Sequence, residues 1–234
     1  GVEVNGLEDV SIQIGKRILK EITFLLSSYP QIHEGFLAKI NIGSFKYFYN
    51  KGLIAEKSIN SYGITFYYEK EGRLCTELYF NSDRFSEKDL LKRARVIKCN
   101  DELGLESIIA HEFGHMLEFY ILYKEKKWDV ICPSIQEINH GLKMEENICG
   151  EFKSEETDII RICEEAIKEN GYSKEFQYRI LDSVGYILGP ASNMNYQECF
   201  AEAIAQYYCC RNHSKLSELI IHKFENLINI KSKE

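Results

Sequence analysis

The sequence predicts an α+β fold, because strand patterns are confined to the first third of the chain and helical patterns fill the rest. Alternating apolar and polar residues recur between positions 38 and 81, and no strand pattern follows Glu87. A chain of 234 residues with 44% apolar residues and three prolines is typical of a folded protein with a sizeable core. We expect one domain over residues 1–234, with a helix and sheet part at 1–100 and a helical part at 101–234.

The first part reads as one helix followed by strands. Before Pro30, four apolar residues recur at helical spacing: Ile14, Ile18, Ile22 and Leu25. Alternation then predicts strands at 38–42, 63–69 and 74–81. No long crossover separates the last two strands, so we expect a small and mostly antiparallel sheet.

The second part reads as successive helices. The helical period predicts them at about 87–95, 102–123, 155–169, 174–188, 195–210 and 214–230. Ser173 and Ser214 are expected N-caps, and Asn170-Gly171 is an expected C-cap. The mixed stretch from Lys124 to Ser154 predicts a loop-rich insertion.

Composition excludes several classes of function. The formal charge of -7 comes from residues of both signs interspersed along the chain, which argues against a nucleic-acid partner. No apolar run reaches the roughly 20 residues of a membrane span, and no signal peptide is seen. Eight scattered cysteines without a C-x-x-C pair favour reduced thiols over disulfides and exclude a thiolate zinc finger. These features favour a cytoplasmic protein.

The chemistry centres on His111, Glu112 and His115. Two histidines four residues apart lie on one helix face, so both imidazoles can reach one metal ion. In the H-E-x-x-H pattern the glutamate is the usual general base. A chance match is the alternative, but the motif lies in a strongly apolar stretch, and Gly114 inside a helix indicates close packing.

A catalytic zinc site needs a third protein ligand. Glu118 and Ile121 stand where the metzincin form of the motif has glycine and a third histidine, so the ligand must come from elsewhere. Glu198 and Glu202 share a helix face, and small residues at 201 and 205 would let their helix approach the motif. Such a pair suits one ligand and one carboxylate that fixes a ligand histidine from behind, although an ordinary solvated acidic pair is the alternative.

The sequence H-E-F-G-H followed by E-C-F-A-E-A resembles the gluzincin metallopeptidases. The resemblance is to their lethal factor-like branch, which includes the Pro-Pro endopeptidases, and to phage head-associated metallopeptidase domains. It implies a zincin-like fold and one Zn²⁺ per chain on His111, His115 and Glu198. It also implies that Glu112 is the base and that Glu202 holds a ligand histidine.

The same resemblance implies a tyrosine that stabilises the transition state, seven residues before the glutamate ligand. Ala191 stands at that position. Tyr186 is the first candidate, if the turn at 189–193 is an insertion, and Tyr196 is the second.

The sequence also suggests where a substrate binds. Peptidases commonly add an extended substrate to a sheet edge, and we expect the strand at 74–81 to be that edge, with Leu78, Tyr79 and Phe80 as substrate-binding residues. An ordinary covered strand is the alternative. The function expected is a zinc-dependent endopeptidase acting on a protein or peptide. The alternative is a non-enzymatic module of a larger phage or mobile-element protein, or of an exported one.

Overall fold

The computed structural model describes residues 2–30, 32, 35–70, 73–97, 101–124, 158–171 and 196–231. These fall into two compact units. The first holds the residues up to Ser86 and the end of helix α4 from Leu122, and the second holds Glu87–Ile121 and the described residues after 156. The α+β class is confirmed.

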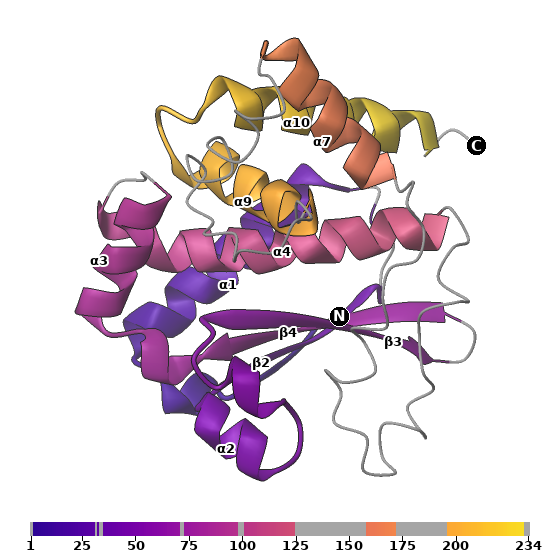
Figure 1. Ribbon diagram of the computed structural model, residues 1–234. Coiled ribbons are helices and arrows are strands. Elements are labelled where there is room, and N and C mark those ends of the chain that lie inside the picture. The colour runs from indigo at the N-terminus through magenta and orange to yellow at the C-terminus, as the bar shows by residue number, and fades with distance from the viewer. Residues whose placement is uncertain are drawn as a thin grey trace. The chain divides into compact units, whose positions relative to one another are not determined.

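The first unit contains a mixed four-stranded sheet in the order β1-β2-β4-β3 (Figure 1). Its strands are β1 (Glu3–Asn5), β2 (Leu37–Gly43), β3 (Gly63–Lys70) and β4 (Arg73–Asn81). β3 and β4 are antiparallel as predicted, but β1–β2 and β2–β4 are parallel. The prediction of a mostly antiparallel sheet is therefore wrong. A helix separates β1 from β2, and β3 lies between β2 and β4 in the chain, which gives the room that a parallel connection needs.

The position of β4 overturns the predicted substrate edge. β4 pairs with β2 on one side and with β3 on the other, so its backbone is already hydrogen-bonded to two neighbours. Leu78 and Phe80 are completely buried, and Tyr79 is 6% exposed. Addition of a substrate strand needs a free edge, so the predicted role of these three residues is wrong.

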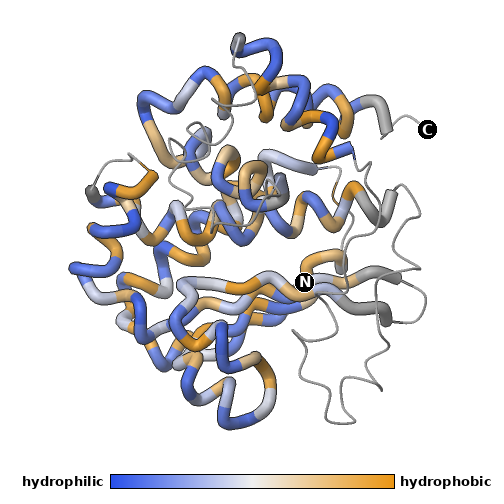
Figure 2. Tube along the Cα trace, viewed as in Figure 1, coloured by the Kyte–Doolittle hydropathy of each residue, from blue (hydrophilic) through white to orange (hydrophobic). Residues whose placement is uncertain are grey.

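Two helices pack on the sheet. In α1 (Ile12–Ser28) the cap Ser11 accepts a hydrogen bond from the backbone N–H of Ile14, and the predicted apolar face is buried. The short α2 (Phe45–Asn50) was not predicted, because six residues hold too little periodicity. Figure 1 shows α1 above the sheet and α2 below it, and Figure 2 shows both apolar and polar residues along the strands.

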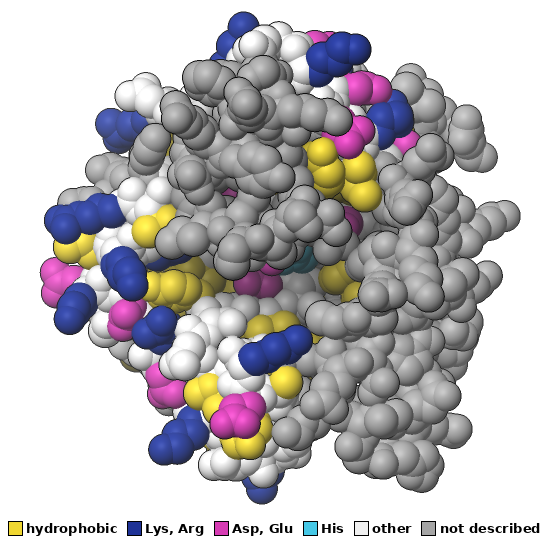
Figure 3. Space-filling view, in the orientation of Figure 1, with side chains coloured by type: hydrophobic (Ala, Val, Ile, Leu, Met, Phe, Trp, Pro, Cys, Tyr) yellow, Lys and Arg dark blue, Asp and Glu magenta, His cyan; other side chains and the backbone are white. Residues whose placement is uncertain are grey.

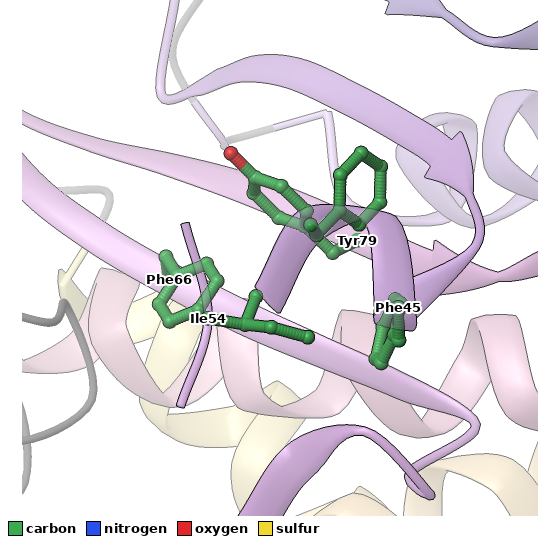
Figure 4. Packing of buried hydrophobic residues seen from close by; sticks show 5 residues of the cluster. Phe45, Ile54, Phe66 and Tyr79 are labelled. Carbon is green, nitrogen blue, oxygen red and sulfur yellow. The ribbon is translucent and has the colours of Figure 1, made fainter. Parts of the chain in front are cut away.

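The face under α2 has an aromatic core. Its members come from α2, from the loop after it and from β3 and β4: Phe45, Phe48, Ile54, Phe66 and Tyr79 (Figure 4). Tyr79 meets the rings of Phe48 and Phe66 edge-on, with centroids 5.4 and 5.1 Å apart. Tyr79 is thus a core residue of the first unit.

The second unit is helical. It holds α3 (Glu87–Val96), nearly all of α4 (Gly104–Lys124), α7 (Asp158–Glu169), α9 (Tyr196–Cys209) and α10 (Lys215–Lys231). All five helices were predicted. The caps at Ser214 and Gly171 are confirmed, since Ser214 accepts from the Ser217 N–H at 3.1 Å and Gly171 has a φ of 80°. The predicted helix at 174–188, the cap Ser173 and the insertion after residue 124 lie outside the described residues.

Two further predictions concern the state of the cysteines and the absence of membrane spans. Four cysteines are free thiols, namely Cys75, Cys163, Cys199 and Cys209. Cys210 is disulfide-bonded, so the prediction of reduced thiols is wrong there. None of the described helices is long and apolar enough to cross a membrane.

Candidate metal centre

Two helices of the second unit bring the predicted site together. His111 and His115 lie one turn apart on α4, and Glu198 lies in the first turn of α9. The helices touch at Gly114, where a β-carbon would stand 2.7 Å from the Cα of Ala201. A real side chain at position 114 would not fit at that distance, so the glycine in the motif permits the close approach predicted from the sequence.

The three side chains converge on one point. The Nε2 atoms of His111 and His115 lie 3.3 and 3.6 Å from the same oxygen, Oε2 of Glu198. All three potential ligand atoms lie within 4.8 Å of one another. Ligands about 2.0–2.1 Å from a tetrahedral zinc are about 3.3 Å apart. The three groups could therefore hold a metal ion, and two imidazoles with one carboxylate are a donor set that zinc and other divalent metals accept.

A buried carboxylate stands behind each imidazole. Oε1 of Glu202 lies 3.4 Å from Nδ1 of His111, and Oε2 of Glu118 lies 3.7 Å from Nδ1 of His115. Both glutamates are 1% exposed. Neither contact has the length and alignment of a good hydrogen bond, yet each carboxylate faces the nitrogen that a metal-binding histidine leaves free. Such partners fix the tautomer and orientation of a ligand imidazole.

Arg93 on α3 pairs with one of the two glutamates of α9. Its Nη1 and Nη2 donate to Oε1 and Oε2 of Glu202 at 2.6 and 2.8 Å. Both oxygens of Glu202 are thereby taken, whereas the carboxylate of Glu198 lies against both Nε2 atoms and is 23% exposed. The sequence left open which of the two glutamates would face a metal. In the structure Glu198 lies at the centre and Glu202 lies behind His111, as the resemblance implied.

Glu112 lies beside this cluster and is 5% exposed. Burial lowers the pKa of Arg93 and of His115, and the charges of Glu202 and Glu198 are the main ones that outweigh it. The charge of Glu112 adds to the rise at both residues, so its carboxylate lies near them. The arrangement thus combines three potential ligands with a neighbouring carboxylate that is able to accept a proton.

The charges of the cluster shift the pKa values of its members. Burial lowers the pKa of His111, but Glu202 and Glu198 outweigh it and raise the pKa to about 9. Burial raises the pKa of Glu202, but Arg93 and His111 bring it down to about 2. His115 and His111 likewise hold the pKa of Glu198 well below its usual range. In the metal-free protein the histidines therefore hold protons, and a divalent cation would replace them.

The predicted tyrosines are not part of the described cluster. The hydroxyl of Tyr196 donates to Glu164 on α7 at 3.1 Å. Burial and the charge of Glu164 also raise the pKa of Tyr196 above its usual value. Tyr196 is thus held toward α7, and Tyr186 lies outside the described residues.

Sequence reasoning missed two members of the site, Arg93 and Glu118. Glu118 is a lone acid in an apolar stretch, three residues after His115, and helical spacing alone places it near that histidine. Arg93 lies three residues after buried Leu90 and four before buried Ile97. That spacing puts it on the inner face of α3, which distinguishes it from exposed Arg95.

The centre is partly open to solvent. The side chains of His111 and His115 are 15% and 16% exposed, and Figure 3 shows histidine and acidic side chains next to each other near the middle of one face. Comparison with models of protein families, with curated proteins and with solved structures gave no match.

Proposed function

We propose that this chain is a zinc-dependent endopeptidase of the gluzincin type. The observation that carries the proposal is the convergence of His111, His115 and Glu198 at the spacing of tetrahedral zinc ligands. Glu112, next to His111 on the same helix, supplies the base that such chemistry needs. A zincin-like fold and a protein or peptide substrate are parts of the same proposal.

Each residue of the centre has a role in this chemistry. A bound zinc ion lowers the pKa of a water molecule toward about 7 and polarises the scissile carbonyl. Glu112 accepts the proton of the attacking water and passes it to the leaving amine. Its low exposure limits exchange of that proton with bulk water. His111, His115 and Glu198 hold the metal, while Glu202 and Glu118 orient the imidazoles.

A donor to the developing oxyanion completes the proposal. Tyr186 is the first candidate by the resemblance. Tyr196 is the second, and it could serve only after its hydroxyl leaves Glu164. A phenol of this kind acts mainly in the transition state, and removing one oxyanion donor typically costs about 100 to 1,000-fold in turnover.

Replacing Glu112 by Gln tests the proposal. The variant keeps all three ligands, so zinc content should stay at about one per chain while hydrolysis of a peptide library is lost. Metal analysis and mass spectrometry of the peptides measure the two effects. Glu106→Gln, one turn and a half earlier on α4, is the control and should keep both zinc and activity.

The outcomes separate the alternatives. Zinc loss in Glu112→Gln would show that Glu112 is a ligand and not the base. Wild-type protein that holds zinc and cleaves no peptide would favour the non-enzymatic module, which is the expectation raised by Ala191 at the place of the family's tyrosine.

A further inference from the structure

Arg93 on α3 and Glu202 on α9 form a buried, bidentate ion pair. Two guanidinium nitrogens meet two carboxylate oxygens at 2.6 and 2.8 Å. The arginine side chain is 11% exposed and that of the glutamate 2%. Fork-to-fork pairs of this kind fix the plane of the carboxylate as well as its charge. The orientation of Glu202 is thus set from α3, a helix that holds none of the proposed ligands.

That orientation is passed on to His111. Oε1 of Glu202 receives Nη1 of Arg93 and also lies 3.4 Å from Nδ1 of His111. Because the second oxygen is held by Nη2, the carboxylate cannot turn without breaking one of the two bonds. Nδ1 of His111 therefore meets an oxygen whose position Arg93 determines.

We infer that Arg93 is a positioning residue for the metal centre, which it acts on through Glu202 and then His111. The inference rests on the proposed zinc site. Arg93 keeps Glu202 turned toward Nδ1, so that Nε2 of His111 remains directed at Glu198. It also prevents Glu202 from competing with Glu198 for the metal.

Substitutions of Arg93 distinguish its geometry from its charge. Lysine keeps the charge but presents a single nitrogen, which cannot hold both oxygens of Glu202 in one plane. Methionine removes the charge and leaves Glu202 buried without its cation. Zinc affinity, measured by competition with a chromophoric chelator at fixed pH, should fall by about 10 to 100-fold in Arg93→Met and by less in Arg93→Lys. Arg95→Met, on the exposed side of the same helix, should leave affinity within about twofold.

A double-mutant cycle tests the route through Glu202. In the Glu202→Gln background, Arg93→Met should change zinc affinity by less than about threefold, because the residue through which it acts has been altered. An equal loss in both backgrounds would overturn the inference, and so would an Arg93→Met value that matches Arg95→Met. If Arg93→Met fails to fold, two other variants replace it. Zinc affinity is then measured in Arg93→Lys and in the double variant Arg93→Met with Glu202→Gln, which contains no unpaired buried charge at this pair.

A metal-free measurement separates this inference from the proposed function. In chelator-treated protein, the imidazole N–H signals of His111 in NMR spectra should shift in Arg93→Lys and Arg93→Met. Those of His115, which faces Glu118, should shift less. If wild-type protein binds no zinc, the proposed function fails, and these signals still decide whether Arg93 positions His111. Unchanged His111 signals, or equal shifts at both histidines, would refute the coupling.

Discussion

The two histidines of the proposed zinc site are supported in different ways. Behind His111 lies Glu202, which comes from another helix and is held at both oxygens by Arg93 on a third. Behind His115 lies Glu118, which comes from the same helix and has no hydrogen-bond partner at either oxygen among the described residues. One imidazole thus faces a carboxylate of fixed orientation, and the other faces a carboxylate held by its own backbone and by packing.

The difference shows how two equivalent contacts can have different energetic origins. A bidentate guanidinium offsets much of the cost of burying the Glu202 carboxylate, whereas the longer ion pair of Glu118 with His115, at 3.7 Å, offsets less of that cost. The His111 side therefore depends on the assembly of α3, α4 and α9. The His115 side needs little more than the helical spacing of α4.

The largest effect is expected from the loss of Glu198, whose carboxylate faces both imidazoles. Glu198→Ala should remove zinc from the protein, because its Oε2 is the atom closest to both Nε2 atoms. Glu202→Ala should only weaken zinc binding, by about 10 to 100-fold. Metal analysis after dialysis measures both. If zinc content falls more in Glu202→Ala than in Glu198→Ala, the roles assigned to the two glutamates are reversed.

The next effect is a pH dependence of the metal-free protein. The pKa of His111 is about 9 in the folded chain and 6.5 unfolded, so its contribution to stability is complete below pH 6.5 and lost as pH rises to about 9. For Glu202 the folded pKa is about 2, so its contribution is complete above its ordinary pKa of 4.5 and lost only as pH falls toward 2. Both contributions are present between pH 4.5 and 6.5.

Denaturant unfolding of chelator-treated protein measures this dependence. Between pH 6.5 and 9 the free energy of unfolding should fall, by on the order of 3 kcal/mol for His111 alone. His115, whose pKa is also raised, should add to the fall. His111→Asn should flatten part of the slope. Stability that is constant over this range would contradict the charge arrangement of the cluster.

Local patterns predicted much of the fold. Helical periods located α1, α3, α4, α7, α9 and α10, because each buries one face or, in α4, almost all faces. Alternation located β2, β3 and β4. Strand order was not predictable in this way, since the direction of a strand depends on how the chain crosses the sheet and not on its own residues. The three residues of β1 and the six of α2 were too short to show a period.

In the candidate site, too, local patterns indicated some residues and missed those whose importance comes from contacts or burial. The pattern of α4 indicated His111, Glu112 and His115, and the pair in α9 supplied the glutamates. Arg93 was missed because its role comes from a contact with Glu202, 109 positions away in the chain. Glu118 was missed although its spacing was visible, because a single acid gives no chemical signal until its burial is known.

A smaller effect is expected where α4 and α9 touch. Alanine usually stabilises a helix over glycine by about 1 kcal/mol. In Gly114→Ala, however, the new β-carbon would lie 2.7 Å from the Cα of Ala201, and overpacking against backbone costs about 1–3 kcal/mol. The net change in unfolding free energy should be destabilising, with weaker zinc binding as α9 and Glu198 move away.

A second helical glycine provides the control. In Gly15→Ala the nearest atom is a methyl group of Leu7 at 3.2 Å, which can move, so that variant should be neutral or stabilising. Ala201→Gly should not rescue Gly114→Ala, because the closest atom is the Cα that glycine keeps. Full rescue by Ala201→Gly would mean that the contact involves the side chain of Ala201 and not its backbone.

The smallest effect is expected from Glu118→Gln, and it sharpens the comparison of the two sides. Glutamine keeps the size of Glu118 and an oxygen for Nδ1 of His115, while it removes a buried charge whose oxygens lack hydrogen bonds in the described chain. Zinc affinity should therefore fall by less than about tenfold, and the metal-free protein should lose less stability than in Glu202→Gln, because the pair of Glu118 with His115, at 3.7 Å, is longer than that of Glu202 with Arg93. Glu202→Gln should cost more in both measurements, because it leaves Arg93 facing an amide where it had a bidentate carboxylate. Equal losses in the two variants would show that a carboxylate behind each histidine matters equally, whatever holds it in place. A larger loss in Glu118→Gln would mean that His115 depends on the charge of its partner more than on its orientation.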